Sequence, residues 1–289
     1  MQKDMEVLVT GLARDTSKRL PSEILRLEKE LKKTFSKVYF FIVESDSTDE
    51  TIEKLSDISQ HKSNFKYISL GKLQSKIPNR IERLTYCRNV YVDQIRNNIE
   101  YKKCEFTVIV DFDIKNNRLD LTVLKDMMED KKWSGLFANQ SGLYYDIYAL
   151  RSRGWCEVNC FEEYEFLASQ HGRKVAKEIA IWSKMKRIPK KSALIKVDSA
   201  FGGLGIYRTN VFNSFDYSAI INNYDSSEHV ILNKKIAKNG GKLFIVPSMT
   251  NFSWNAHNLS RYSLIRKLDR GSKIGLFRFI RSLMRNLLH

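Results

Sequence analysis

Two aspartates one residue apart, Asp111 and Asp113, are the residues of this chain best suited to carry chemistry. They follow the apolar run 106–110, whose β-branched residues are typical of a buried parallel strand. In an open α/β sheet, ligands lie outside the carboxyl ends of the strands. Two carboxylates there suit Mg²⁺ or Mn²⁺, and the ion would hold a diphosphate. The pair could instead belong to a solvated turn or a helix cap, so its interpretation depends on the rest of the chain.

A second group of acids follows an earlier predicted strand. Glu44 and Asp46 lie at its end, in the segment Val43-Glu-Ser-Asp-Ser-Thr-Asp-Glu-Thr51. Ser47 or Thr48 could cap the helix that comes next. A capped helix with solvated acids explains part of this segment, but it does not explain acids in front of the cap. We therefore expect a second strand end that carries functional carboxylates.

Hydrophobic periodicity places these acids in an alternating pattern of strands and helices. Strands are predicted at 6–13, 38–44, 65–70 and 106–110, and helices at 22–35 and 80–89. This alternation predicts a parallel, doubly wound α/β sheet. Arg80, Arg83 and Arg88 of the second helix could approach a phosphate, or they could form a solvated helix face.

After the two aspartates, strands and helices no longer alternate regularly. Helices are predicted at 121–130, 163–185 and 225–241, the last capped by Ser226 or Ser227, and strands at 135–139, 145–151, 193–208 and 243–247. Gly202, Gly203 and Gly205 do not form a Rossmann fingerprint, because no helix pattern follows them. They either let the backbone approach a ligand closely, as at a sugar pocket, or form a β-bulge.

Two further polar residues have an ordinary explanation beside a functional one. Glu228 lies in the first turn of the last predicted helix, where the helix dipole favours an acid whatever its function. His257 lies in the polar segment 254–258, and a lone loop histidine is most often only exposed.

Composition limits the kind of protein. The 289 residues, 43% of them hydrophobic, are enough for one large α/β domain, and the net charge of +16 implies an anionic partner. The four cysteines form no Cys-x-x-Cys pair, which favours free thiols in a reducing cytoplasm. The sequence shows neither a secretory signal pattern nor an apolar stretch of membrane-spanning length.

The segment 259–289 differs from the rest in its charge. It carries eight Lys or Arg against one acid, Asp269. Drawn as a helix, it has an apolar face with Arg278, Arg281 and Arg285 opposite, the pattern of a helix that lies on an anionic membrane. The alternative is a helix packed on the domain or on a second subunit.

Four segments together resemble the GT-A nucleotide-sugar glycosyltransferases. Within that fold the chain is most similar to fungal capsule-associated mannosyltransferases and to bacterial enzymes that build O-antigen or capsule polysaccharide. The resemblance covers about residues 5–258 and implies a GT-A, Rossmann-like α/β domain at 1–258, with a mixed, mainly parallel sheet flanked by helices and a C-terminal amphipathic helical tail at 259–289. The segments are 43–51, 110–113, Asp198-Ser-Ala-Phe-Gly-Gly-Leu-Gly-Ile-Tyr-Arg208 and Ser227-Glu-His-Val230.

The resemblance also implies roles for single residues. Nucleotide binding maps to Thr10, Gly11, Ala13, Arg14 and Glu44. Asp111 and Asp113 would hold Mn²⁺ or Mg²⁺ against the diphosphate, with Asp113 as the direct ligand and His257 completing the sphere. Arg88 would contact the diphosphate or the donor sugar. If the enzyme inverts the sugar, Glu228 is the candidate base, with Asp198 second. If it retains the configuration, Glu228 would hold the acceptor instead.

The expected function is transfer of a sugar from a UDP- or GDP-linked donor to a lipid-linked glycan acceptor in surface polysaccharide synthesis. The enzyme would lie on the cytoplasmic face of the cell membrane, held by 259–289, with no nucleic-acid partner. A metal-dependent nucleotidyltransferase is an alternative, although 10–15 is a poor version of its phosphate loop. A nucleic-acid-binding protein is a third possibility. It predicts basic residues interleaved with aromatics, whereas the excess charge lies in the tail and in 184–196.

Overall fold

The computed structural model describes residues 5–112, 120–121, 123–128, 132–221, 224–225 and 227–251. By contacts the chain divides into two units, Met1–Phe252 and Ser253–His289. The predicted residues Asp113 and His257 and the predicted tail 259–289 lie outside the described residues, so the expectations for them stay predictions.

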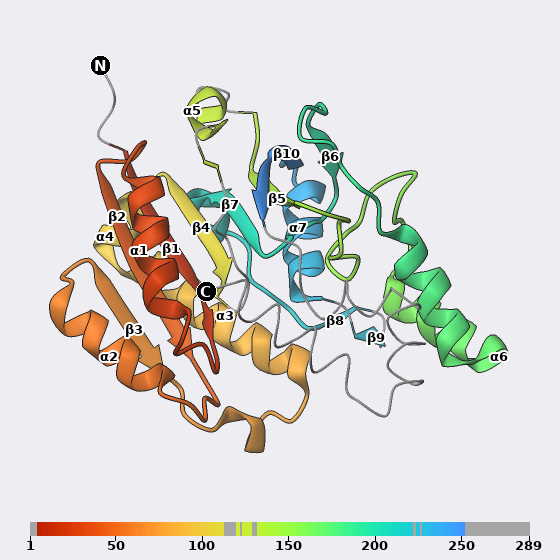
Figure 1. Cartoon of the computed structure of the whole chain (residues 1–289), viewed down its shortest axis with the longest axis horizontal. Coiled ribbons are helices and arrows are strands. Elements are labelled where there is room, and N and C mark those ends of the chain that lie inside the picture. Colours follow the sequence, from red (N-terminus) through yellow and green to blue (C-terminus); the bar gives the residue numbers. More distant parts are fainter. Residues whose placement is uncertain are drawn as a thin grey trace, which may run out of the picture. The chain divides into compact units, whose positions relative to one another are not determined.

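An eight-stranded mixed sheet forms the centre of the first unit, in the order β3-β2-β1-β4-β7-β5-β10-β6 (Figure 1). Four of its neighbouring pairs are parallel, and β7 and β6 run antiparallel to their neighbours. The sheet is therefore mainly parallel, as predicted. Its strands are β1 (Glu6–Ala13), β2 (Lys37–Glu44), β3 (Phe65–Ser69), β4 (Phe106–Asp111), β5 (Gly135–Gln140), β6 (Ile195–Val197), β7 (Leu204–Arg208) and β10 (Leu243–Asn251).

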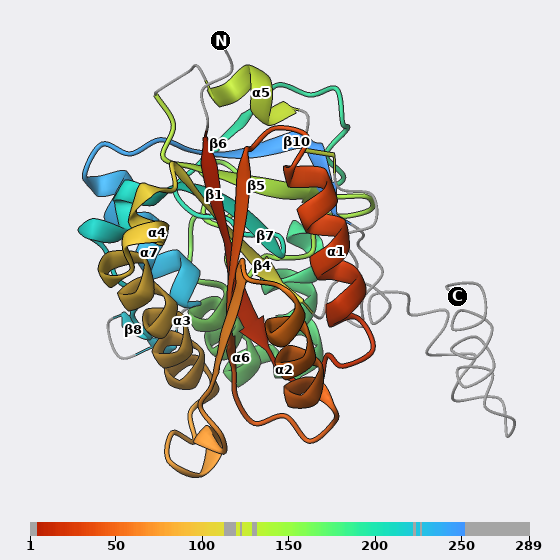
Figure 2. The same ribbon diagram turned by 90° about the vertical axis from the view of Figure 1, so that its left-hand side faces the viewer.

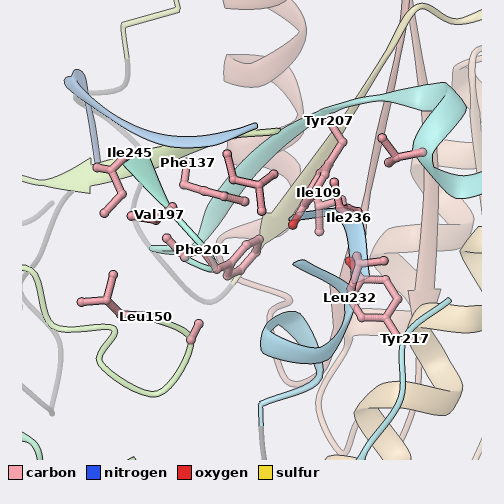
Figure 3. Packing of buried hydrophobic residues seen from close by; sticks show 14 of the residues in the cluster. Ile109, Phe137, Leu150, Val197, Phe201, Tyr207, Tyr217, Leu232, Ile236 and Ile245 are labelled. Atoms are coloured by element: carbon pink, nitrogen blue, oxygen red, sulfur yellow. The ribbon is translucent and has the colours of Figure 1, made fainter. Parts of the chain in front are cut away.

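Helices cover both faces of this sheet, and side chains alternate between two cores. In Figure 2, α1 (Leu20–Leu31) and α2 (Thr51–His61) lie on one side of the sheet, and α3 (Arg80–Asn97), α4 (Ile99–Lys103) and α7 (Glu228–Lys238) on the other. Along β1, Val7 and Val9 join the core under α1, whereas Leu8 joins the core under α3. Figure 3 shows part of the second core, where Leu232 and Ile236 of α7 lie near Ile109 and Tyr207 of the sheet. This alternation is what a strand buried on both faces requires.

The remaining described elements are short, apart from α6. They are η1 (Leu73–Ser75), α5 (Val123–Met128), α6 (Cys160–Ala180), η2 (Trp182–Lys184), η3 (Thr209–Asn213) and the small hairpin β8 (Ile220–Ile221) and β9 (Tyr224–Asp225). The helix predicted at 163–185 ends at Ala180 and is interrupted at Gly172, whose φ is 79°. A left-handed glycine of this kind breaks the regular helix.

The prediction of a strand at 145–151 is wrong. The segment forms turns, and its last residue, Arg151, makes an isolated bridge with Ser199. Asp146 Oδ1 accepts a hydrogen bond from the Ala149 N–H, and the buried Arg151 guanidinium donates to the carbonyls of Ile147 and Tyr148. These local side-chain bonds compete with a sheet ladder for the same backbone.

The strand predicted at 193–208 is two strands, β6 and β7. They are separated by residues 198–203, where Gly202 and Gly203 have φ of 69° and 81°. A strand cannot continue through two left-handed residues, and only glycine adopts them cheaply. The last strand is longer than predicted, because a register shift between Val246 and Thr250 accommodates Pro247 within β10.

Two smaller expectations can also be compared with the structure. All four cysteines are buried with free thiols, as predicted. Among the described residues, none of the helices is both long enough and apolar enough to span a membrane.

Candidate active site

The two predicted groups of acids lie at one edge of the sheet. Ala13 of β1 pairs in register with Glu44 of β2, and Leu12 pairs with Asp111 of β4. Ser69 of β3 is opposite Glu44. The carboxyl ends of these four parallel strands, from here on called the acid edge, therefore lie side by side, as an open α/β sheet requires.

The loops that follow β1 and β2 are bonded to one another. Asp15 has a left-handed φ of 51°, and its Oδ1 accepts hydrogen bonds from both the N–H and the hydroxyl of Thr48. The backbone N–H groups that a phosphate loop would offer to its ligand are already used here, which argues against a nucleotidyltransferase. The N–H groups of Asp15, Thr16 and Ser17 donate to Ser47 Oγ, Thr51 Oγ1 and Asp49 Oδ2.

The predicted caps of α2 are wrong. The helix begins at Thr51, and the Asp49 carboxylate accepts a hydrogen bond from the Thr51 N–H at 3.0 Å. Ser47 and Thr48 are instead bonded to the loop after β1. The N-cap position itself is Glu50, whose side chain makes no capping hydrogen bond.

Most of the predicted nucleotide-binding residues are buried and bonded within the protein. Thr10 Oγ1 donates to Phe41 O, and the fully buried Glu44 carboxylate accepts from Ser47 N and Ser69 Oγ. A Cβ on Gly11 would lie 2.1 Å from Val110 O, so glycine is required by close strand packing.

Ala13 is also buried, whereas the Arg14 side chain is 49% exposed and lies 3.4 Å from Gln74 Oε1. Of the five residues, Arg14 is thus the one whose side chain is open to a ligand.

The other acid of the second strand end, Asp46, is buried beside an arginine. Its carboxylate lies 3.4 Å from Arg83 Nε, and the Arg83 Nη1 group donates to the carbonyls of Ile77 and Pro78. Arg83 thereby ties the loop before α3 to the acid edge, which makes its role structural. Arg80 is exposed on the same helix.

Arg88 joins two of the predicted functional acids. Its Nε donates to Glu228 Oε1 at 2.8 Å, and its Nη2 lies 3.5 Å from Asp111 Oδ1. Arg88 is 4% exposed and Glu228 is 5% exposed, so their charges meet where water does not screen them. Residues 88, 111 and 228 are far apart in the sequence, and the fold brings them together.

Aromatic side chains enclose this group. The rings of Phe201 and Tyr217 each lie 5.6 Å from the Arg88 guanidinium carbon, and the hydroxyl of Tyr91 is within 3.3 Å of Nη1. Burial raises the pKa of Tyr91 to about 12, so Tyr91 stays neutral beside Arg88. Burial lowers the pKa of Arg88, but its electrostatic interactions with Tyr91, Glu228 and the other neighbours outweigh burial and hold it above its ordinary value.

His229 is a member of this group that sequence reasoning did not assign. Its ring stacks on Phe201 at 3.8 Å between centroids and meets Tyr217 edge-on at 5.6 Å. Neither ring nitrogen has a hydrogen-bond partner in the described part of the chain. Burial, with the charge of Arg88, lowers the pKa of His229 well below its ordinary value. The one signal in the sequence was a histidine next to Glu228 in a helix whose neighbours are apolar.

Asp198, the second candidate base, is not brought to the acid edge. Val197 at the end of β6 pairs with Leu243, the first residue of β10, which runs in the same direction as β4. Asp198 therefore leaves the sheet at the edge opposite to Asp111. Its side chain is exposed, and its electrostatic neighbour is Lys234.

The glycines of the segment 202–205 approach the protein's own backbone. A Cβ on Gly202 would lie 2.4 Å from Ala138 O, and one on Gly205 would lie 3.1 Å from the Phe137 ring. The Gly203 carbonyl accepts a hydrogen bond from the Asp111 N–H at 3.0 Å. This contact fixes the end of β4 against the turn before β7.

The described residues contain part of the predicted metal site. Asp111 is a hard oxygen ligand at a strand end with a side chain 32% exposed, which fits Mg²⁺ or Mn²⁺. Within the described ranges, no group of three or more His, Cys, Asp or Glu residues could hold a metal ion. The fit therefore rests on Asp111, with Asp113 and His257 as predicted partners outside the described residues.

No protein-family model and no curated protein matches this chain. Solved structures of other proteins do match it. TarS residues 1–349 from S. aureus, in complex with UDP-GlcNAc, match with a TM-score of 0.51 at 15% identity, over 89% of this chain and 62% of that one. The chain has a GT-A-like fold.

A second structure with this fold is the mannosyltransferase PcManGT from Pyrobaculum calidifontis, in complex with GDP-Man and Mn²⁺. Its TM-score is 0.51 at 12% identity, and the match covers 92% of this chain and 65% of that one. The chain thus spans less than two thirds of either protein. These likenesses confirm the predicted fold, whereas the finer resemblance to fungal capsule-associated mannosyltransferases stays a prediction.

Proposed function

We propose that this chain is a metal-dependent glycosyltransferase that takes its sugar from a nucleotide-diphosphate donor. The observation that carries the proposal is the Asp111–Arg88–Glu228 group at the carboxyl end of a central strand. Support comes from the GT-A-like fold and from proteins of that fold solved with UDP-GlcNAc or with GDP-Man and Mn²⁺. A nucleotidyltransferase is less well supported, because the N–H groups after β1 are occupied.

The residues present suit substitution at an anomeric carbon. A divalent ion at Asp111, when bound, would stabilise the departing nucleoside diphosphate as a Lewis acid. Glu228 is our candidate for the carboxylate that takes the proton of the acceptor hydroxyl, if the enzyme is inverting. Arg88 holds this carboxylate in one position, and both side chains are buried away from water. Arg14 is the remaining candidate for contact with the nucleotide.

The acceptor and the location of the enzyme are part of the proposal. We infer a lipid-linked glycan acceptor in surface polysaccharide synthesis, on the cytoplasmic face of the membrane. This inference is supported by the basic amphipathic sequence of 259–289 and by the resemblance to polysaccharide-building enzymes.

The test is isothermal titration of the full chain with UDP, GDP, CDP and ADP, in Mn²⁺ and in EDTA. We expect one nucleotide to bind only with the metal, and the binding to be lost in the Asp111→Ala/Asp113→Ala variant. Glu228→Gln should keep nucleotide affinity and lose about 100-fold or more in turnover if Glu228 is the base. Absence of binding by all four nucleotides, from protein with a normal unfolding transition, would reject the proposal.

A further inference from the structure

Four buried polar side chains end two interior strands, beside the acid edge. β5 ends in Asn139 and Gln140, and β10 ends in Thr250 and Asn251. All four are at most 2% exposed. In register, Thr250 is opposite Asn139, and Asn251 is opposite Gln140. Packing alone does not explain four such residues, because burying polar groups costs free energy unless each is bonded.

A bulge in β10 places Asn251 next to Gln140. Val246 pairs with Ala138, and the next pair is Thr250 with Asn139, so residues 247–249 are extra. Asn139 Nδ2 holds this bulge by donating to Pro247 O at 2.9 Å. Bulges are frequent beside functional sites, where they re-aim a side chain. Here the side chain that is re-aimed is Asn251.

The two amides are oriented by a shared acceptor. Gln140 Nε2 and Asn251 Nδ2 both donate to the carbonyl oxygen of Gly202, at 2.8 and 2.9 Å. Neither amide can be reversed without losing this bond, so both side-chain oxygens face away from Gly202. Gln140 Oε1 and Asn251 Oδ1 are buried, and neither has a hydrogen-bond partner among the described residues. An unpaired buried acceptor costs about 1–3 kcal/mol, so two in adjacent positions need an explanation.

The amide pair is connected to Asp111 through the turn Gly202–Gly203. Gly202 accepts from the two amides, and the next residue, Gly203, accepts from the Asp111 N–H. Gly202 is required by its φ of 69° and by the contact with Ala138. One turn of two glycines thus links the amide pair to the strand end at which the donor diphosphate is proposed to bind.

We propose that Gln140 Oε1 and Asn251 Oδ1 accept hydrogen bonds from hydroxyl groups of the donor sugar and so select that sugar. This inference rests on the proposed function. Two neutral amide oxygens that accept no hydrogen bond from the described residues match the donors of hydroxyl groups. A phosphate at neutral pH is mainly a hydrogen-bond acceptor and does not match them. Because the acceptors are buried, a sugar without the matching hydroxyl would leave one unpaired and would be rejected strongly.

The experiment compares the affinity of the full chain for a nucleotide sugar with its affinity for the bare nucleoside diphosphate. UDP-glucose, UDP-GlcNAc and GDP-mannose are titrated first, to find the donor that binds. Gln140→Met and Asn251→Leu should each reduce the affinity for that donor about tenfold or more relative to UDP or GDP. Their affinity for UDP or GDP alone should stay within about twofold, because the amides do not contact the nucleotide.

Asn233→Leu is the matched control. Asn233 is also a fully buried amide, but its Oδ1 already accepts a hydrogen bond from the Tyr207 hydroxyl. Its substitution should leave the ratio of donor affinity to nucleotide affinity unchanged.

A second measurement needs no substitution. Monodeoxy analogues of the donor are titrated into the wild-type chain, and at least one should bind about 10- to 100-fold more weakly. Equal binding of all the analogues, or an unchanged affinity ratio in both folded variants, would overturn the inference and indicate an internal water between the amides. If none of the nucleotides binds, the proposed function fails as well, and the two failures are thereby distinguished.

Discussion

At the scale of single residues, Arg88 determines the electrostatics of the candidate site. It is ion-paired with Glu228 and lies beside the partly exposed Asp111, and the rings of Phe201 and Tyr217 flank its guanidinium. Removing one partner of a buried ion pair costs about 3–5 kcal/mol, because the other charge is left without compensation. The ion pair therefore holds the Glu228 carboxylate in one position, and a substrate has to approach it there.

The buried His229 makes stability sensitive to acid. Its pKa is lowered in the folded protein, so the unfolded chain takes up a proton as the pH falls below about 6.5 while the folded chain does not. The nearby Glu228 carboxylate, 3.7 Å from Nε2, would favour the charged ring, but it is already paired with Arg88. We expect the free energy of unfolding to be fully retained above pH 6.5 and to fall by up to about 1.4 kcal/mol per pH unit below it.

Denaturant titrations between pH 8 and pH 5 test this expectation. His229→Phe keeps an aromatic ring on Phe201 but cannot titrate, so its stability should fall less steeply with acid than that of the wild type. His61→Gln, a substitution at an exposed histidine outside this core, is the matched control. The same acid dependence in wild type and His229→Phe would contradict the assignment.

At the scale of elements, hydrophobic periodicity predicts strands that end in acids, but it does not predict turns and bulges that depend on side-chain hydrogen bonds. The strands ending in Glu44 and Asp111 were predictable, because each is a continuous apolar run that stops at an acid. The turns at 145–151 were not, because side-chain hydrogen bonds of Asp146 and Arg151 outweigh the β-branched and aromatic composition. The bulge in β10 was also hidden, since it depends on Asn139, over 100 residues earlier in the chain.

Alanine substitutions at two glycines distinguish the free-energy cost of a left-handed backbone from the cost of a steric clash. Gly154 and Gly202 have nearly the same φ, 72° and 69°, but a Cβ on Gly154 meets open space, whereas one on Gly202 meets Ala138 O at 2.4 Å. Gly154→Ala should cost about 1–2 kcal/mol of unfolding free energy, which is the left-handed penalty alone. Gly202→Ala should cost at least about 2 kcal/mol more, because backbone must move. Equal losses in denaturant titrations would show that the turn before β7 adjusts freely.

At the scale of the whole molecule, the sequence predicts the order of elements better than their arrangement. Alternating strands and helices indicated the parallel half of the sheet correctly. The insertion of β7 between β4 and β5 has no local signal, because it depends on long-range pairing. The candidate site has the same limit, since Arg88 and Glu228 are 140 residues apart and their contact was not readable from spacing. The resemblance to GT-A enzymes indicated these residues, but not that they pair.

The excess positive charge of segment 259–289 should bind the chain to anionic membranes. A chain that ends at residue 252 keeps the whole first unit, so we expect it to fold. The full chain should sediment with vesicles that contain anionic lipid, since a basic residue near such a surface contributes about 1 kcal/mol, and salt should weaken this binding. The shortened chain should remain in the supernatant. Arg278→Gln/Arg281→Gln/Arg285→Gln in the full chain is the control for charge alone, and it should bind less. If the shortened chain sediments with the anionic vesicles, the membrane affinity does not come from 259–289. Equal binding of the full chain to neutral vesicles would show that its charge is not the cause.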